Sequence, residues 1–355
     1  MVELYGKNWT RTELLSKVGD VAQIGGVRLS ELSDGRERGV RVADFRTGAG
    51  LAFTVHIDRG LDIGAAEYNG QALGWRSAAG VTGPAYYQPE GLGWVQGFPG
   101  GLLTTCGLST AGAPGIDEGT PLGLHGPISY TPAQNVWADG VWEGDSYEMF
   151  VQGRVREGCL FGHKLEMERR IAARLGETRL TVSDRVTNLG GAPAPLMILY
   201  HCNLGFPLLD EHAELLTPAR QVLPRDEAAR QGLARYNRFE PPQPGYAEQV
   251  FFHELDAASD GYVTVALVNR RANAGQGLGV YIRYRQRELP CFTEWKMMGH
   301  GDYVVGLEPG NCWPIGRGAA RAQGSLVLLE PGESREYHLE IGVLSGAEQL
   351  AAIGN

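Results

Sequence analysis

Three polar residues occupy apolar or glycine-rich surroundings where each could do chemistry. His201 follows the largely apolar stretch 195–200, Glu308 ends the apolar run 304–307, and His125 lies in the sequence GLHGP. A histidine that stays inside after such a strand has lost its solvation, so it needs a partner or a ligand. We expect each of the three side chains to emerge at the end of a strand.

Each of these residues has a plain structural interpretation when it is taken alone. Glu308 is followed by Pro-Gly, and so is Glu330, so both carboxylates could simply cap turns. Buried histidines with satisfied hydrogen bonds are also common. Together, however, a His and a Glu at the mouth of a β-rich concavity form an acid–base pair. Such a pair can move protons at two oxygens of one substrate without a metal or a cofactor, and His125 could orient the ligand.

Aromatic residues are frequent in the same segments. Aromatic rings flanked by hydrogen-bond donors suit the C–H faces and hydroxyl edges of a sugar, although several of these rings will belong to the core. A small-molecule sugar is therefore one ligand that these residues would suit, although burial in the core is the commoner fate of any single ring. The rings near the three polar residues are those of Trp94, Phe98, Phe206, Phe292, Trp295 and Trp313.

The composition predicts that many short strands position these residues. The chain has 51 glycines and 19 prolines among 355 residues, about twice the usual share of glycine. Alternating apolar and polar runs are separated by turns, among them Asn69-Gly70, which is typical of a hairpin. Residues 163–191 predict a long hairpin with one wet face, and Pro331-Gly332 predicts a hairpin near the end of the chain. The pattern favours an antiparallel β-sandwich or barrel.

Helical signals are few. A capping box, Thr10 to Glu13, begins a short N-terminal helix that continues over Leu14, Leu15 and Val18. Residues 224–236 and 347–353 are the other helical candidates. No βαβ alternation and no phosphate-binding glycine motif is present, so we expect no cofactor. We expect one domain over residues 1–355, with residues 205–250 as a long surface excursion.

Charge and cysteine content limit the classes of partner and the redox state that we expect. The chain has 32 Lys and Arg against 41 Asp and Glu, a net charge of −9, which would repel nucleic acid. The stretch MVELYGKNWTRTELL has no apolar segment typical of a signal peptide, and no run of 18 apolar residues occurs, so we expect a cytoplasmic protein without a membrane partner. Five cysteines without a Cys-x-x-Cys spacing favour free thiols. Whether the chain forms a homodimer stays open.

Six motifs carry a resemblance to a known group of proteins. The chain resembles the uncharacterised relatives of aldose 1-epimerase in the galactose mutarotase-like superfamily, over nearly its whole length. The resemblance implies a large antiparallel β-supersandwich whose concave face holds a sugar. The motifs are Arg59-Gly60-Leu61-Asp62, GGLLTTCGL, GLHG, YHCNLGFPLLDE, FTEWKMMG and VVGLEPGN.

The resemblance also implies catalytic roles. His201 resembles the superfamily histidine that protonates the ring oxygen, and Glu308 resembles the late glutamate that deprotonates the anomeric hydroxyl. His125 resembles the first histidine of a His-Gly-Gly motif that holds the sugar's oxygens. Here Pro127 replaces the last glycine, which removes a backbone donor. No metal is implied.

Further candidates for substrate binding come from the same motifs. Arg59 and Asp62 resemble groups that sugar-phosphate epimerases place near the N-terminus, although an Arg–Asp pair in a turn is an equal alternative. The Trp-Asn-Pro-Trp-like strand of hexose-6-phosphate epimerases is replaced by residues 292–296. Four residues close in sequence to His201 or to the strand before Glu308 are also candidates for contacting the substrate. The charged ones, Glu294 and Lys296, could instead form an ion pair on the face of a strand. These four are Asn203, Glu294, Trp295 and Lys296.

Three functions are compatible with these residues. We favour a cofactor-independent carbohydrate epimerase, a mutarotase acting at the anomeric carbon of an aldose or sugar derivative. A non-catalytic carbohydrate-binding protein could use the same cleft. A metal-dependent sugar isomerase would use His125, His201 and Glu308 as ligands, but the sequence lacks the usual His-x-His pair. Neither the sugar nor whether it is phosphorylated or acidic follows from the sequence.

Overall fold

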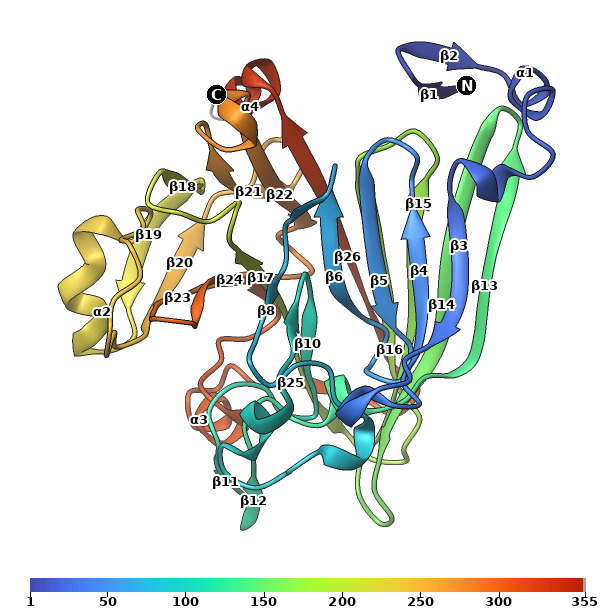
Figure 1. Cartoon of the computed structure of the whole chain (residues 1–355). Coiled ribbons are helices and arrows are strands. Elements are labelled where there is room, and N and C mark those ends of the chain that lie inside the picture. The colour runs from blue at the N-terminus through green and yellow to red at the C-terminus, as the bar shows by residue number, and fades with distance from the viewer. Residues whose placement is uncertain (354–355) are drawn as a thin grey trace.

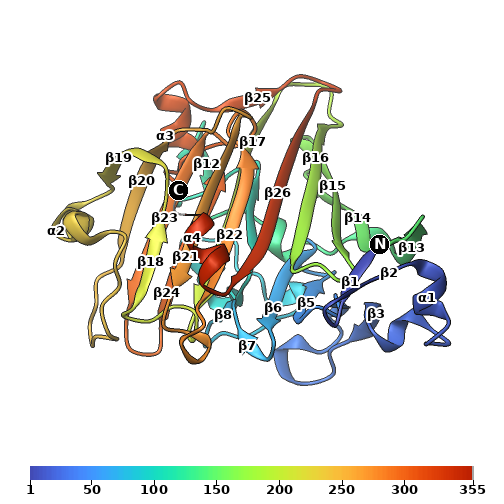
Figure 2. The ribbon, with the colours of Figure 1, turned by 90° about the horizontal axis from the view of Figure 1, so that it is seen from above.

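The computed structural model describes residues 1–353, which form three antiparallel sheets. Figures 1 and 2 show the sheets packed around a common interior, with the five-stranded sheet beside the first strands of the eight-stranded one. This arrangement is an antiparallel β-sandwich, so the predicted fold class is confirmed. None of the helices in the described residues combines the length and hydropathy that crossing a bilayer requires.

The eight-stranded sheet contains the long hairpins. Its strands, in spatial order, are β13 (Gln134–Glu143), β14 (Ser146–Gly158), β15 (Lys164–Arg174), β16 (Arg179–Asn188), β26 (Ser334–Ser345), β22 (Leu278–Arg285), β21 (Tyr262–Asn269) and β18 (Ala213–Leu216).

The seven-stranded sheet carries both predicted catalytic residues. Its strands, in order, are β10 (Thr104–Leu108), β17 (Ala194–Gly205), β24 (Tyr303–Gly310), β23 (Cys291–Met298), β20 (Gln249–Leu255) and β19 (Ala219–Pro224), with β25 (Val327–Leu329) paired to the start of β17.

The remaining elements are shorter. The five-stranded sheet contains β3 (Gly26–Glu31), β4 (Arg41–Arg46), β5 (Leu51–His56), β6 (Asp62–Tyr68) and β7 (Gln71–Ala72). Three two-stranded pairs are β1 (Val2–Leu4) with β2 (Lys7–Trp9), β8 (Trp75–Arg76) with β9 (Gly100–Gly101), and β11 (Gly115–Asp117) with β12 (Thr120–Leu122). The α-helices are α1 (Arg11–Leu15), α2 (Glu227–Gly232), α3 (Arg317–Ala322) and α4 (Ala347–Ala352). The 3-10 turns are η1 (Val21–Gln23), η2 (Gly35–Glu37), η3 (Pro84–Tyr86), η4 (Gly93–Gly97), η5 (Ile128–Tyr130), η6 (Leu233–Arg235) and η7 (Asn273–Gly275).

Several local predictions are confirmed. Strands β15 and β16 form the expected long hairpin, and Leu165, Met167 and Ile171 are buried on one face. The turn at Asn69-Gly70 joins β6 to β7. Thr10 caps α1 with the predicted capping box, and α2 and α4 lie in the other two helical candidates.

Other local predictions are wrong. The Pro331-Gly332 turn does not close a hairpin, because β25 pairs with β17 whereas β26 pairs with β16 and β22. Helix α1 ends at Leu15 rather than continuing over Val18. Residues 205–250 are more than a surface excursion, since β18 and β19 lie at the edges of two different sheets. For the turn and for residues 205–250, pairing with a distant strand, which local sequence does not encode, determines the structure.

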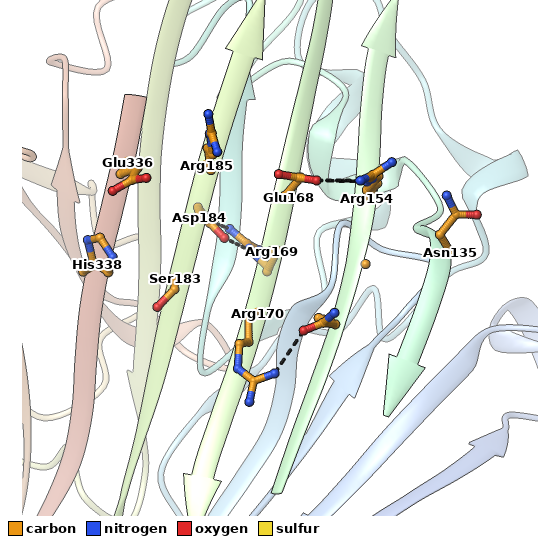
Figure 3. Close-up of a pocket in the computed structure, with 12 residues that line it drawn as sticks. Asn135, Arg154, Glu168, Arg169, Arg170, Ser183, Asp184, Arg185, Glu336 and His338 are labelled. Carbon is orange, nitrogen blue, oxygen red and sulfur yellow. Dashed lines mark hydrogen bonds and ion pairs between the residues drawn. The ribbon is translucent and has the colours of Figure 1, made fainter. Parts of the chain in front are cut away.

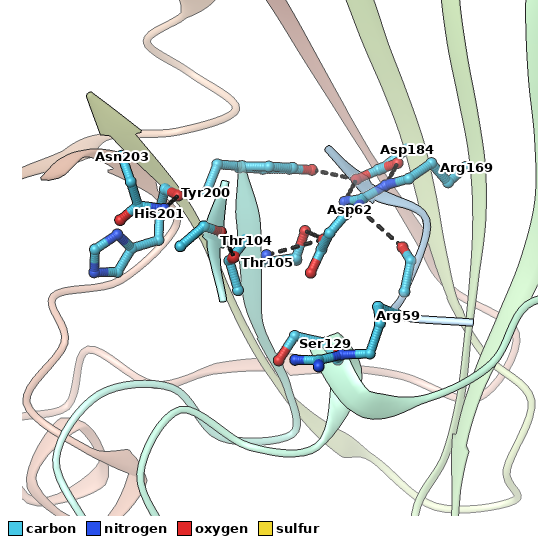
Figure 4. A network of polar contacts seen from close by, with 12 residues as sticks. Arg59, Asp62, Thr104, Thr105, Ser129, Arg169, Asp184, Tyr200, His201 and Asn203 are labelled. Atoms are coloured by element: carbon cyan, nitrogen blue, oxygen red, sulfur yellow. Dashed lines mark hydrogen bonds and ion pairs between the residues drawn. The ribbon is translucent and has the colours of Figure 1, made fainter. Parts of the chain in front are cut away.

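A buried polar cluster around Arg169 joins the three sheets (Figure 4). Arg169 donates to Asp184 at 2.8 and 2.5 Å, and to Asp62 at 3.0 Å. Asp62 also accepts hydrogen bonds from the backbone and hydroxyl of Thr105, at 3.0 and 2.7 Å. The Tyr200 hydroxyl donates to Asp184 at 2.7 Å. Arg169 and Asp184 belong to the eight-stranded sheet, Asp62 to the five-stranded sheet, and Thr105 and Tyr200 to the seven-stranded sheet.

We predict that Arg169→Leu destabilises the fold strongly. The substitution leaves two buried carboxylates without their cation, and breaking a buried ion pair in this way costs about 3–5 kcal/mol. Urea unfolding followed by circular dichroism measures the loss. Arg154→Leu is the control, because Arg154 makes a solvent-exposed pair with Glu168 on the neighbouring strand and its removal should change the unfolding midpoint little. Equal midpoints for the two variants would refute the proposed importance of the cluster.

Candidate functional site

His201 and Glu308 lie side by side on neighbouring strands. Cys202 of β17 is the partner of Leu307 in β24, so the residues flanking this pair, His201 and Glu308, are also adjacent. His201 Nε2 is 3.1 Å from a carboxylate oxygen of Glu308. His201 is 5% exposed and Glu308 is 3% exposed, so both are buried. The expectation that they emerge at strand ends is wrong: both lie within strands, and β24 continues through Pro309 to Gly310.

The alternation of β17 explains which way His201 points. Tyr200 points to the Arg169 cluster, and the next residue, His201, points away from it, as Figure 4 shows. Thr104 of β10 is the register partner of His201. On the other side, Thr293 of β23 is the partner of Glu308. The site is therefore built on the face of the seven-stranded sheet opposite to the cluster.

Aromatic rings surround the His–Glu pair. The ring centroid of His201 lies 5.4 Å from those of both Phe98 and Trp295. Trp75 touches both of these rings, with centroid distances of 6.1 and 6.3 Å. Trp94 packs on Phe98 at 4.6 Å. These rings form an aromatic wall, defined as Trp75, Trp94, Phe98 and Trp295, of the kind that packs on the C–H face of a sugar.

His125 reaches the same place from a turn. Its ring centroid lies 4.8 Å from that of Trp94 and 6.0 Å from that of His201. The backbone N–H of Gly112 donates to His125 Nδ1 at 3.3 Å. Because Nδ1 accepts, the neutral ring carries its proton on Nε2, so His125 offers a donor at Nε2. The structure thus brings together His125, His201 and Glu308, three residues that lie far apart in the sequence.

Burial controls the protonation of the pair. Burial lowers the pKa of His201 to about 3, with His125 as a second cause, and burial alone lowers the pKa of His125 to about 4. Burial also raises the pKa of Glu308 to about 8, with a smaller contribution from the carboxylate of Glu248. At neutral pH the His201–Glu308 pair therefore holds one proton, which resides on Glu308.

Three buried polar atoms at the site have no hydrogen-bond partner among the described residues. They are Nδ1 of His201, the side-chain oxygen of Asn203 and the hydroxyl of Thr293. The amide nitrogen of Asn203 is already engaged, donating to the carbonyl oxygens of Gly101 and His201. Because buried polar groups are normally hydrogen-bonded, these atoms are suited to meet a ligand's hydroxyl groups. Thr293 was not predicted as a site residue from the sequence, although it lies two residues before Trp295 on the same strand.

Strand β23 divides its candidate residues between two faces. Trp295 faces the site, and its indole N–H donates to Glu248 at 2.8 Å. Glu294 and Lys296 face the opposite way and are fully buried. Glu294 lies 3.0 Å from His253 Nε2, and Lys296 Nζ lies 2.8 Å from Glu240. The structure therefore does not bring Glu294 and Lys296 to the His201–Glu308 pair.

Arg59 and Asp62 also lie behind the site. The Arg59 guanidinium donates to the carbonyl oxygens of Ser129, Thr82 and Gly97, at 2.5, 2.8 and 3.1 Å. Asp62 belongs to the Arg169 cluster. Figure 4 shows both residues separated from His201 by β10 and β17. Because Trp94 donates to the Ser129 hydroxyl at 3.2 Å, Arg59 braces the segment that supports one ring of the aromatic wall.

A polar hollow elsewhere on the surface contains none of the predicted site residues. It covers about 530 Å³ on β14, β15 and β16 (Figure 3). The exposed Arg154 is paired with Glu168, and the half-buried Arg170 is paired with Glu148. Its acidic and basic groups are mixed, as on an ordinary solvated sheet face. Within residues 1–353, no three His, Cys, Asp or Glu side chains gather in a group that could hold a metal ion.

Comparisons with known proteins agree with the fold. Residues 37–343 match the family described as Domain of unknown function (DUF4432). A solved protein from Klebsiella pneumoniae subsp. pneumoniae MGH 78578, proposed to be an aldose 1-epimerase, is 28% identical with a TM-score of 0.87, over 92% of this chain and 85% of that one. Galactose 1-epimerase from Lactobacillus acidophilus NCFM is 13% identical with a TM-score of 0.57, over 91% and 99%.

A third solved structure extends the same likeness. A galactose mutarotase-like protein from Clostridium acetobutylicum is 12% identical with a TM-score of 0.61, over 91% of this chain and 99% of that one. At this identity the likeness concerns the fold alone. A comparison with curated proteins finds no match.

We predict that the His201 ring stays neutral well below the usual range for histidine. Its pKa of about 3 predicts that its ring C–H chemical shifts stay constant between pH 7 and pH 5, a range below the raised pKa of Glu308. Proton–carbon NMR of the folded protein measures these shifts, with His201→Gln used to assign the signal. In denaturant the same ring should titrate near its ordinary pKa of about 6.5. A titration midpoint between pH 5 and pH 7 in the folded protein would show that Glu308 holds His201 charged.

Proposed function

The chain belongs to the DUF4432 family, and we propose that it is a cofactor-independent carbohydrate epimerase that interconverts the anomers of an aldose or sugar derivative. The observation that carries the proposal is the buried contact of 3.1 Å between His201 Nε2 and Glu308, placed against an aromatic wall. An acid and a base this close can serve two neighbouring oxygens of one sugar ring. The fold shared with aldose 1-epimerase-like proteins supports the same class of chemistry.

The reaction begins with a proton shift inside the pair. At rest Glu308 is protonated and His201 is neutral, so neither group is ready to act. Transfer of the proton across the 3.1 Å contact produces a carboxylate and an imidazolium. Hydroxyl groups of a bound sugar would replace some of the lost solvation and favour this charged form.

Ring opening then requires two proton transfers, one from the sugar to Glu308 and one from His201 to the sugar. Glu308 takes the proton of the anomeric hydroxyl while His201 gives its proton to the ring oxygen, and the bond between the anomeric carbon and the ring oxygen breaks. The resulting aldehyde rotates about its bond to the next carbon. Closure on the other face returns both protons, so the pair ends each cycle as it began.

The other site residues hold the sugar in this scheme. His125 donates from Nε2 to a sugar oxygen, and the free oxygens of Asn203 and Thr293 accept from hydroxyl groups. Trp295 presents its ring to a C–H face, held in place by its hydrogen bond to Glu248. For the remaining candidates we propose an indirect role, because their polar groups are used inside the protein. These are Arg59, Asp62, Glu294 and Lys296.

A second candidate function is a carbohydrate-binding protein without catalysis. The observation that favours it is the neutral resting state of the pair, since a carboxylic acid and a neutral imidazole can hydrogen-bond hydroxyl groups without transferring protons. The next prediction separates the two functions.

We predict that Glu308→Gln abolishes anomer exchange but preserves sugar binding. Glutamine keeps the shape and hydrogen bonding of the side chain but cannot accept the proton, so the rate should fall at least about 100-fold. Exchange NMR between α and β anomers over a panel of aldoses, deoxysugars, uronic acids and sugar phosphates measures the rate. Glu330→Gln is a matched control, because Glu330 precedes the same Pro-Gly dipeptide in an exposed turn. Binding without exchange in the wild-type protein would favour the non-catalytic function.

We predict that the exchange rate falls as the pH rises above about 8. The pair needs its shared proton, which is present below the raised pKa of Glu308 and lost above it. The rate should therefore fall tenfold per pH unit in this range, after subtraction of the uncatalysed reaction. Measuring kcat/KM between pH 5 and pH 10 tests this sign. A rate that increases through pH 8 would mean that the deprotonated pair is the active form and would overturn the scheme.

A further inference from the structure

An ion pair between Arg225 and Glu248 lies at the rim of the candidate site. Arg225 directly follows β19, Glu248 directly precedes β20, and the guanidinium donates to the carboxylate at 2.9 Å. Arg225 also donates to Asp226, whose other oxygen caps α2. Figure 1 shows α2 beside β19 and β20 at one end of the seven-stranded sheet. The side chains of the pair are 39% and 49% exposed, so the pair faces solvent where the buried site begins.

Glu248 connects this ion pair to the aromatic wall. One of its oxygens accepts the hydrogen bond from Arg225, and the other accepts the indole N–H of Trp295 at 2.8 Å. The ring centroid of Trp295 lies 5.4 Å from that of His201. Because a rotation of the indole would break its hydrogen bond to a carboxylate that Arg225 already holds, Glu248 determines how the ring is presented to the site.

The titratable groups packed around Glu308 carry no charge at neutral pH. Burial lowers the pKa of His201 to about 3 and that of His125 to about 4, so both rings are neutral. Burial, with a smaller contribution from Glu308 itself, raises the pKa of the thiols of Cys106 on β10 and Cys202 on β17. These four groups therefore bring no charge to the carboxyl group of Glu308.

The charges that act on Glu308 come from the rim. Burial is the main reason why its pKa is raised to about 8, and the carboxylate of Glu248 raises this pKa further. The guanidinium of Arg225 lowers it by a smaller amount. A carboxyl group whose pKa is raised keeps its proton up to a higher pH. The negative charge of Glu248 therefore helps to keep the shared proton within the His201–Glu308 pair.

We propose that Arg225 and Glu248 are positioning residues of this site: Glu248 holds the Trp295 ring beside the His201–Glu308 pair and, balanced by Arg225, keeps the shared proton in that pair. Neither residue touches the reacting atoms. Their effect on turnover rests on the proposed epimerase function. Their effect on the ring and on the proton does not, since it also applies to a protein that only binds carbohydrate.

Two variants with opposite effects test the role in retaining the proton. Glu248→Gln removes the negative charge but keeps an oxygen that can accept from Trp295, and Arg225→Gln removes the positive charge. The measurement is a titration of the His201 ring C–H shifts from pH 6 to pH 10 without a ligand, because ionisation of Glu308 at 3.1 Å changes these shifts. We expect the midpoint, about pH 8 in the wild-type protein, to be lower in Glu248→Gln and higher in Arg225→Gln.

A second ion pair on the same two strands supplies matched controls. Arg220 of β19 pairs with Glu254 of β20 at 2.9 Å, and neither residue acts on Glu308. Arg220→Gln and Glu254→Gln should therefore leave the midpoint as in the wild-type protein. Equal midpoints in all five proteins, or shifts of both rim variants in the same direction, overturn the proposal. A His201 ring without any change over this pH range also overturns it, because no shared proton would then be lost.

The role in holding the ring has its own measurement. Glu248→Leu removes the acceptor of the Trp295 indole N–H, whereas Glu248→Gln retains one. Proton–nitrogen NMR measures the hydrogen exchange of this N–H with water, with Trp295→Phe used to assign the signal. We expect exchange at least about tenfold faster in Glu248→Leu, the size of one lost hydrogen bond, and close to wild type in Glu248→Gln. The same exchange rate in all three proteins overturns the role of Glu248 in holding the ring.

Kinetics separate this proposal from the epimerase function. In an epimerase, the pH above which kcat/KM falls should move in the same directions as the His201 midpoints. Anomer exchange whose pH dependence is the same in both rim variants overturns the positioning role and leaves the epimerase. Midpoints that move in opposite directions, without anomer exchange of any sugar, support the positioning role and overturn the epimerase.

Discussion

The Arg169 guanidinium, buried between Asp184 and Asp62, is the interaction on which the arrangement of this protein depends. Together with Thr105 and Tyr200, which bind its two carboxylate partners, it joins the three sheets through side chains. The Tyr200 hydroxyl donates to Asp184 of the same cluster and thereby holds the face of β17 that is directed toward the cluster. Since neighbouring residues of a strand face opposite ways, fixing Tyr200 also fixes the direction of His201. The ion cluster therefore positions the candidate site although it does not contact it.

The protein contains two buried His–Glu pairs, and comparing them shows what makes one of them a candidate for catalysis. His201–Glu308 and His253–Glu294 have almost the same separations, 3.1 and 3.0 Å, and both lie on the seven-stranded sheet. The side chains of the second pair are completely excluded from the surface, whereas those of the first retain 7% and 3% exposure beside the aromatic wall. Burial raises the pKa of both glutamates. Access to a ligand therefore distinguishes the two pairs.

Aromatic rings form one wall of the candidate site. Trp295 is held by its hydrogen bond to Glu248, and Trp75 packs against both Trp295 and Phe98. Rigid rings of this kind lose little conformational entropy when a ligand binds. They therefore offer a preformed surface on which the C–H face of a ligand can pack.

The sequence by itself determined the parts of this protein that depend on local patterns and residue chemistry. Alternation identified the hairpin of β15 and β16, the glycine content and the absence of helical periodicity indicated an antiparallel β fold, and the capping box marked α1. The apolar context of His201 and Glu308 singled them out as residues without ordinary solvation. These signals are local because side-chain periodicity and capping act within a few residues.

Only the tertiary structure decided which strands are neighbours and which face each residue occupies. Glu308 looked like a turn residue, yet pairing with β17 and β23 keeps β24 extended through Pro309. Glu294 and Lys296 looked like ligand contacts beside Trp295, but the alternation of β23 turns them to the other face. Arg59 carries the charge expected of an anion-binding group, but its guanidinium donates its hydrogen bonds to carbonyl oxygens from three distant segments. Such outcomes depend on contacts between residues far apart in the chain, which no local pattern specifies.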